Sequence, residues 1–143
     1  MNESIKKYMK VGLVHFMAYP FAMSGEGDIA GTVRRVLSDD YFDAIELTRI
    51  ADPNERRRVA DLVKQAGVAF GYGAQPQLLR NQENVNSLDE SLRLRAVNRI
   101  KSLIDEAYEM DADGFAYLAG KYDPTRIEEA YQALVKSTEE ILA

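Results

Sequence analysis

Short apolar segments alternate with longer amphipathic ones along the chain. Each apolar segment is rich in Val, Ile, Phe and Tyr and shows little strict alternation, which is typical of parallel strands that are covered on both faces. A helical pattern follows each segment, so the order predicts four strand–helix units. The predicted strands are "KVGLVHFMAY" (10–19), "FDAIELTRI" (42–50), "GVAFGYGAQ" (67–75) and "DGFAYLAG" (113–120).

Capping signals set the bounds of the predicted helices. The first helix runs from about 28 to 39. The second starts at Pro53, a favoured first helical position, and ends before Gly67, a C-cap signal. The third opens in "SLDE" (87–90), which fits a capping box that starts at Ser87. The fourth begins at "DP" (123–124).

This order places the chain in the α/β class with a parallel sheet and right-handed crossovers. If all helices lie on one side, the other face of the sheet is left bare unless the sheet closes into a barrel. A (β/α)8 barrel needs about 250 residues, and this chain has 143. We therefore expect either one half of a barrel or a small open α/β sheet. We see no linker, so we predict one domain over 1–143.

Composition narrows the function classes. The formal charge of −5 argues against nucleic acid as a partner. The chain has no cysteine, which excludes thiolate metal sites and a cysteine nucleophile, and its single histidine is His15. No apolar run approaches the roughly 20 residues of a membrane span, and the N-terminus has no signal-peptide core, so we expect a cytoplasmic protein.

The glycine-rich stretch "GEGDIAG" (25–31) invites comparison with nucleotide-binding loops. Its glycines are spaced G-x-G-x-x-x-G, and four residues separate them from the predicted strand end near Pro20. A dinucleotide loop needs its first glycine directly at the strand end. We interpret the stretch as the end of a mobile first loop, with Asp28 as N-cap. A phosphate or hydroxyl bound at the helix N-terminus stays an alternative.

Candidate site residues lie where the predicted strands end, because ligands of parallel α/β folds meet those ends. Glu46 is a carboxylate inside an apolar strand, and a buried carboxylate needs a partner or a polar cavity. It is either paired structurally, with Arg49 or a neighbouring strand, or it serves the site by binding hydroxyls or moving protons.

Three further residues are candidate substrate contacts. His15 is either a hydrogen-bonded core residue or a ligand contact. Gln75 is suited to binding a polyol but also to capping a loop, and Lys121 is either an anion contact or a solvated side chain. The long polar loop that follows Gln75 has the composition of a loop that binds a hydroxylated ligand. The basic run 56–58 is predicted to be a solvated helix face.

From residue 42 onward the chain resembles the sugar phosphate isomerase/epimerase family, the xylose isomerase-like TIM barrels. The matching pieces are "FDAIEL", "NVNSLDESLRLRAVNRIKSLIDEAYEMDADGF" and "LAGKYDPTRIEEAYQALVKSTEEIL". The resemblance covers the N-terminal half of such a barrel. It implies a half-barrel of four strands and four helices. Of the candidates at the strand ends, only Glu46 corresponds to a carboxylate typical of the family, and we expect it to be catalytic. From their places at the strand ends we expect His15, Gln75 and Lys121 to bind substrate.

Members of that family bind a divalent cation, often Mn²⁺, Mg²⁺ or Co²⁺, through two Glu, an Asp and a His. The resemblance implies that these ligands come mainly from later strands, so we expect no metal ligand set within this chain and no activity of the chain alone. The implied ligand is a small sugar or polyol.

Two other functions compete with this enzyme half. A non-catalytic module would assemble through its exposed strand edges, so we expect either a homo-oligomer or a missing C-terminal half. An open flavodoxin-like domain that binds a phosphorylated ligand is the third hypothesis, and the missing phosphate loop argues against it.

Overall fold

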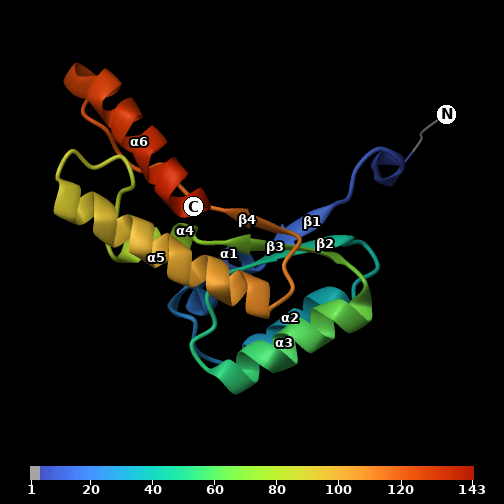
Figure 1. Ribbon diagram of the computed structural model, residues 1–143. Helices are drawn as coiled ribbons and strands as arrows, with labels where there is room; N and C mark the ends of the chain where they lie inside the picture. Colours follow the sequence, from blue (N-terminus) through green and yellow to red (C-terminus); the bar gives the residue numbers. More distant parts are fainter. Residues whose placement is uncertain (1–3) are drawn as a thin grey trace.

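The computed structural model describes residues 4–143 and contains a parallel sheet with helices packed on one face (Figure 1). The sheet order is β1-β2-β3-β4 and every neighbouring pair is parallel. This order needs three crossovers of the same hand, which places the connecting helices on a single side. It confirms the predicted α/β half-barrel. The strands are β1 (Gly12–Val14), β2 (Ala44–Leu47), β3 (Ala69–Gly73) and β4 (Gly114–Ala116).

The four predicted helices are present, together with short ones that the sequence pattern did not reveal. The long helices are α2 (Ile29–Leu37), α3 (Pro53–Ala66), α5 (Glu90–Glu109) and α6 (Ile127–Leu142). The additional short helices are α1 (His15–Ala18), α4 (Gln75–Arg80), η1 (Ile5–Lys7), η2 (Pro20–Ser24) and η3 (Pro124–Arg126). The first predicted strand, 10–19, is therefore too long, because its second half forms α1. Among residues 4–143, no helix combines the length and apolarity of a membrane span.

Three of the predicted helix ends can be checked against the hydrogen bonds. The Asp28 carboxylate accepts a bond from Gly31 N at 2.9 Å, which confirms it as the N-cap of α2. Gly67 ends α3 with φ +67°, a left-handed conformation that glycine adopts without strain. The predicted cap at Ser87 is wrong. Asp89 caps α5 instead, by accepting bonds from Ser91 N and Leu92 N.

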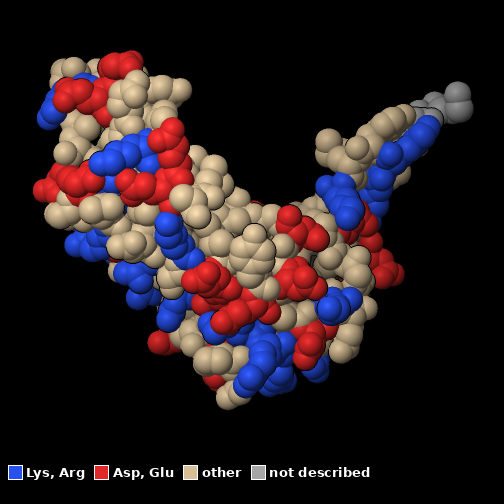
Figure 2. Space-filling model, in the orientation of Figure 1, with Lys and Arg blue, Asp and Glu red and all other residues tan. Residues whose placement is uncertain are grey.

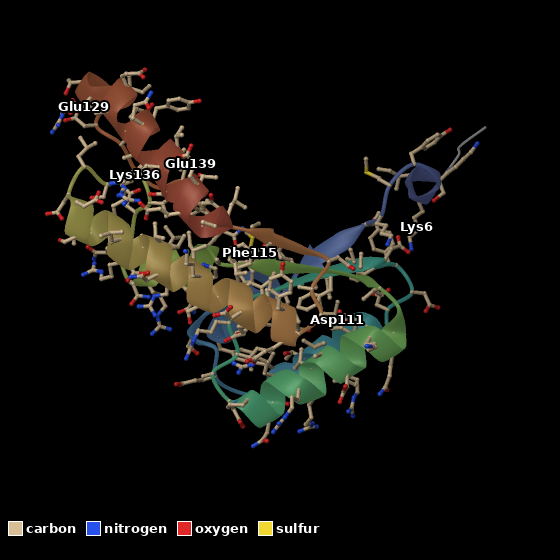
Figure 3. All side chains as sticks on the ribbon, viewed as in Figure 1. Lys6, Asp111, Phe115, Glu129, Lys136 and Glu139 are labelled. Atoms are coloured by element: carbon tan, nitrogen blue, oxygen red, sulfur yellow. The ribbon has the colours of Figure 1, made fainter. Side chains whose placement is uncertain are left out.

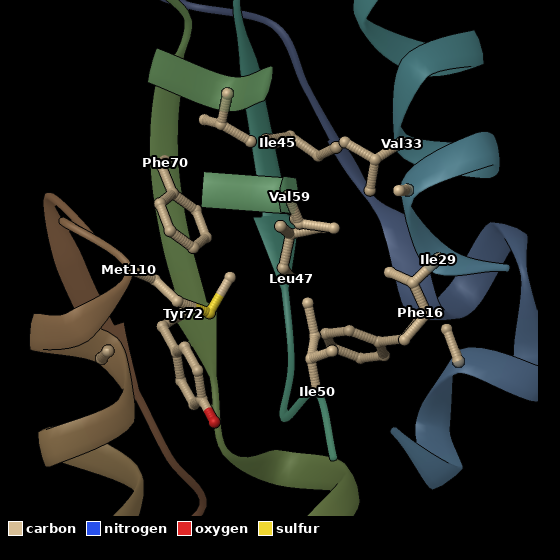
Figure 4. Close-up of a cluster of buried hydrophobic side chains, with 14 of the residues drawn as sticks. Phe16, Ile29, Val33, Ile45, Leu47, Ile50, Val59, Phe70, Tyr72 and Met110 are labelled. Carbon is tan, nitrogen blue, oxygen red and sulfur yellow. The ribbon is translucent and has the colours of Figure 1, made fainter. Parts of the chain in front are cut away.

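One face of the sheet carries the core. A row of large side chains crosses neighbouring strands at Leu47, Tyr72 and Phe115. Two residues earlier along β2 and β3, Ile45 pairs with Phe70 on the same face. The rings of Tyr72 and Phe115 stack with centroids 5.5 Å apart. Figure 4 shows the labelled strand residues beside side chains from α2 and α3 and beside Met110, which directly follows α5. Because strand side chains alternate, the positions between them must face away from the helices.

The other face is nearly free of large side chains. Val14, Glu46, Gly71 and Gly114 form one row across the four strands. No helix of the described chain covers this row, and Figure 2 shows a broad hollow between α6 and the N-terminal segment. Glu46 is the only charged side chain in the row, so the sheet presents one carboxylate on an otherwise small-residue surface.

A buried carboxylate joins three elements on the packed face. Glu106 of α5 accepts hydrogen bonds from Ile50 N at 2.8 Å and from the Tyr72 hydroxyl at 3.0 Å. Arg56 of α3 donates to the same carboxylate at 2.9 Å and also pairs with Glu109. The prediction that all of 56–58 is a solvated face is therefore wrong for Arg56. Burial and the neighbouring carboxylate raise the pKa of Tyr72, which stays a proton donor.

A second polar cluster holds α6 against α5. The guanidinium of Arg93 is 1% exposed and donates hydrogen bonds to Glu90, Glu140 and Ser137. Hydrogen bonds from Arg93 and Lys136 lower the pKa of Glu90 to about 2. Ion pairs and hydrogen bonds thus hold α5 and α6 together.

Candidate functional site

Glu46 and Gln75 converge at the ends of two neighbouring strands. Glu46 occupies the third position of β2, on the face away from the helices, and Gln75 begins α4 two residues after β3 ends. Gly73 lies between them. A Cβ atom on Gly73 would lie 2.4 Å from Glu46 Oε1 and 2.4 Å from Gln75 Oε1. The two oxygens are therefore no further apart than twice that distance, and glycine is what allows them to approach.

Neither oxygen has a partner within the described chain. Gln75 Oε1 is buried and accepts no hydrogen bond. The Glu46 carboxylate forms no hydrogen bond or ion pair with any of residues 4–143, so the alternative in which it pairs with Arg49 is not seen there. Two neighbouring acceptors favour a ligand that donates, such as a pair of hydroxyl groups. If the Gln75 amide group rotates by about 180° about its terminal C–C bond, its NH₂ group takes the place of the oxygen and can donate a hydrogen bond.

Two further residues lie near these strand ends, Phe16 in α1 and Thr48 directly after β2. The Phe16 ring of α1 comes within 3.1 Å of the Cβ position of Gly73. Thr48 follows β2 directly, is 4% exposed, and its hydroxyl has no hydrogen-bond partner among residues 4–143. A buried hydroxyl without a partner is uncommon and costly. The usable sequence signal was Gly73, since a glycine two residues before a polar side chain at a strand end permits close approach.

His15 lies in the interior. Its side chain is 1% exposed, and Nε2 is 2.9 Å from the Thr32 hydroxyl of α2. Burial lowers the pKa of His15 from 6.5 to about 4, so the ring is neutral at pH 7. The structure agrees with the hydrogen-bonded core alternative. The predicted substrate contact of His15 stays a prediction.

The buried histidine predicts a pH effect on stability. Because the folded pKa lies below the unfolded one, unfolded chains bind the proton first as the pH falls below 6.5. Between pH 7 and pH 4.5 we expect His15 to contribute about 2–3 kcal/mol to the loss of unfolding free energy. Urea denaturation of wild type and His15→Gln at both pH values measures this difference. Equal losses in the two proteins would contradict the prediction.

Lys121 lies in a different hollow. It is exposed after β4 and forms no ion pair within the described chain. Its backbone carbonyl accepts a hydrogen bond from the Asn84 amide at 2.6 Å. The surrounding hollow, of about 530 Å³, is lined by Leu78, Leu79 and Leu118 among others. No contact joins Lys121 to the Glu46–Gln75 pair, and its predicted role in substrate binding stays a prediction.

The glycine-rich stretch has a conformational explanation. Gly25 has φ +79°, and its carbonyl accepts a hydrogen bond from Ala51 N at 2.8 Å. A Cβ on Gly25 would approach the Arg49 carbonyl to 2.8 Å, and one on Gly27 would meet the Phe21 ring at 2.9 Å. Backbone shape and close packing account for these two glycines, and the expected mobility of the loop stays a prediction.

A divalent cation would need several ligands at one point. Among residues 4–143, the structure brings together no group of three or more His, Cys, Asp or Glu side chains that could hold one. At the Glu46–Gln75 site the described residues offer Glu46 as the one carboxylate. The described residues thus do not fit the cation that the family resemblance implies, and we derive no step through it.

Solved structures share this arrangement of strands and helices. A D-tagatose 3-epimerase-like protein matches 93% of the chain with a TM-score of 0.70 and 18% identity. An L-ribulose 3-epimerase matches 92% with a TM-score of 0.62 and 17% identity. The likeness shows the fold. The half-barrel spans 47% and 46% of those two proteins' lengths. No family model and no curated protein matches its sequence.

Proposed function

We propose that this chain forms part of the mouth of a sugar isomerase or epimerase barrel, where Glu46 and Gln75 bind hydroxyl groups of the sugar. The observation that carries the proposal is the convergence of two unpaired oxygen acceptors over Gly73. The two epimerase structures of like fold support it, since one is named for D-tagatose and the other for L-ribulose.

The chemistry assigned to each residue follows from its atoms. Isomerisation and epimerisation of sugars move a proton next to a carbonyl carbon, and a carboxylate is suited to that transfer. We assign this role to Glu46, which has no competing partner within the described chain. Gln75 orients the sugar by accepting or donating one hydrogen bond to a hydroxyl group. Phe16 provides an apolar wall for the carbon skeleton.

The proposal assigns no cation ligand to the described residues. The divalent cation stays an expectation from the family resemblance, with ligands supplied by strands beyond β4. We therefore expect the isolated chain to bind ketoses weakly and to turn none over. Nucleic acid and membrane lipid are not among the proposed ligands.

Titration of isotope-labelled protein with D-tagatose or L-ribulose tests the proposal by NMR. We expect millimolar binding with chemical-shift changes centred on Glu46, Gly73 and Gln75. Glu46→Gln and Gln75→Ala should each weaken binding by at least about fivefold, since each removes one hydrogen bond of roughly 1 kcal/mol or more.

Matched controls separate the site from general effects. Asp105→Asn removes an exposed carboxylate from α5, and Gln65→Ala truncates an exposed glutamine of α3. Both should leave binding unchanged. Shifts spread over the surface, or equal losses in the controls, would overturn the proposal, and so would turnover of a ketose by the isolated chain without Glu46.

A further inference from the structure

Phe16 and Gln75 reach the candidate site from segments that follow different strands. Phe16 lies in α1, which follows β1, and Gln75 begins α4, which follows β3. These two strands are not neighbours, because β2 lies between them. Strand pairing fixes the ends of β1 and β3, and other contacts must fix the segments that extend beyond them.

One side-chain hydrogen bond joins the two segments. Gln77, in the first turn of α4, donates from Nε2 to the Met23 carbonyl of η2 at 3.2 Å. Among residues 4–143, no other hydrogen bond connects residues 15–28 with α4. Gln77 is 7% exposed, so water replaces this bond poorly when it is lost.

η2 is itself anchored to the segment that follows β2. Gly25, which ends η2, accepts a hydrogen bond from Ala51 N at 2.8 Å. On the other side of η2, the rings of Tyr19 and the buried His15 have their centroids 5.0 Å apart. η2 therefore has a fixed place, against which Gln77 can hold α4.

α4 depends on tertiary contacts for its orientation, because a helix of six residues gains little stability of its own. Before the helix begins, Ala74 N donates to the Ala116 carbonyl of β4 at 2.8 Å. In the middle of the helix, Leu78 packs in the smaller buried cluster. Rotation of α4 about these two attachments would redirect the Gln75 side chain, and the Gln77 bond opposes that rotation.

We propose that Gln77 is a positioning residue of the candidate site. Its bond to the Met23 carbonyl holds α4 in the orientation in which the Gln75 amide meets Glu46 over Gly73. This role rests on the proposed function, since Gln75 is the residue that orients the sugar there. Gln77 touches no substrate and acts only through Gln75.

Gln77→Met keeps the length of the side chain and removes its donor, and NMR titration with D-tagatose or L-ribulose measures the effect. We expect binding about threefold to fivefold weaker than in wild type. Combined with Gln75→Ala, the substitution should cause no loss beyond that of Gln75→Ala alone, because a residue that acts through another is not additive with it. Gln77→Glu keeps the shape without the donor and should behave as Gln77→Met does.

Gln132→Met is the matched control. Gln132 is an exposed glutamine of α6 whose amide also donates one hydrogen bond, to Glu128 at 2.9 Å. Figure 3 shows its neighbours Glu129 and Lys136 on the part of α6 that extends away from the sheet. This variant should bind as wild type does, and every variant should keep the circular dichroism spectrum of the wild type.

A readout without ligand separates this role from the sugar site. In wild type we expect NOEs between the Gln75 side-chain amide and the Phe16 ring, since both lie within 3.1 Å of the Cβ position of Gly73. Gln77→Met should lose these NOEs, and Gln132→Met should keep them. Unchanged NOEs in Gln77→Met, or additive losses of affinity in the double variant, would overturn the role of Gln77. Absence of ketose binding by wild type would refute the proposed function, and the NOEs would still decide what positions Gln75.

Discussion

Replacing Glu106 by alanine is expected to lower the free energy of unfolding by about 3–5 kcal/mol. The substitution removes the acceptor for the Ile50 amide, the Tyr72 hydroxyl and the Arg56 guanidinium at once. Each of these groups is shielded from water, so each loses a bond that the solvent cannot fully replace. Chemical denaturation followed by circular dichroism measures the change.

Glu109→Ala is the matched control for this prediction. Glu109 lies one turn further along α5 and pairs with the same guanidinium, but its side chain is 60% exposed. Exposed ion pairs contribute at most about 1 kcal/mol. A loss of similar size in the two variants would show that the cluster around Glu106 does not hold β2, β3 and α3 together.

Gly73→Ala is expected to weaken sugar binding strongly while leaving the fold intact. The new methyl group would take the space at 2.4 Å from both Glu46 Oε1 and Gln75 Oε1. These atoms end flexible side chains, so they can move apart at little cost to stability. The hydroxyl-binding geometry is lost, and we expect at least a tenfold weaker affinity with a change in stability below about 1 kcal/mol.

The same strand provides a close control. Gly71 lies two residues earlier on the same face, and a Cβ there would meet the Glu46 side chain no closer than 3.6 Å. This is ordinary van der Waals contact, so Gly71→Ala should bind as wild type does. NMR titrations of Gly73→Ala and Gly71→Ala with the same sugar measure the two affinities. Equal affinities would refute the convergence of Glu46 and Gln75 as the binding geometry.

Much of the fold could be predicted from the order of apolar segments. The strand–helix alternation predicted the parallel sheet, and Pro53 and Asp28 marked two helix starts correctly. Strand lengths were overestimated because apolar residues continue past β1 into α1, where they pack as helix side chains. The cap of α5 was misplaced because Ser87 and Asp89 are both good caps, and only three-dimensional contacts choose between them.

The site was predictable in part. Glu46 and Gln75 could be predicted as candidates because polar residues at strand ends are unusual in an apolar context. Their meeting over Gly73 could not be foreseen, since it depends on the register between β2 and β3. The role of Arg56 was hidden for a related reason, because its partner Glu106 is 50 residues away in the chain.

The two faces of the sheet differ in their side chains, and this difference affects which substitutions the protein can accept during evolution. The aromatic and aliphatic face packs against the helices in the larger buried cluster, and the small side chains of the glycine-rich row on the opposite face bury little apolar area. Substitutions around Glu46 can therefore accumulate without unfolding the protein. A sheet built this way is free to acquire new ligand specificities while its scaffold stays constant.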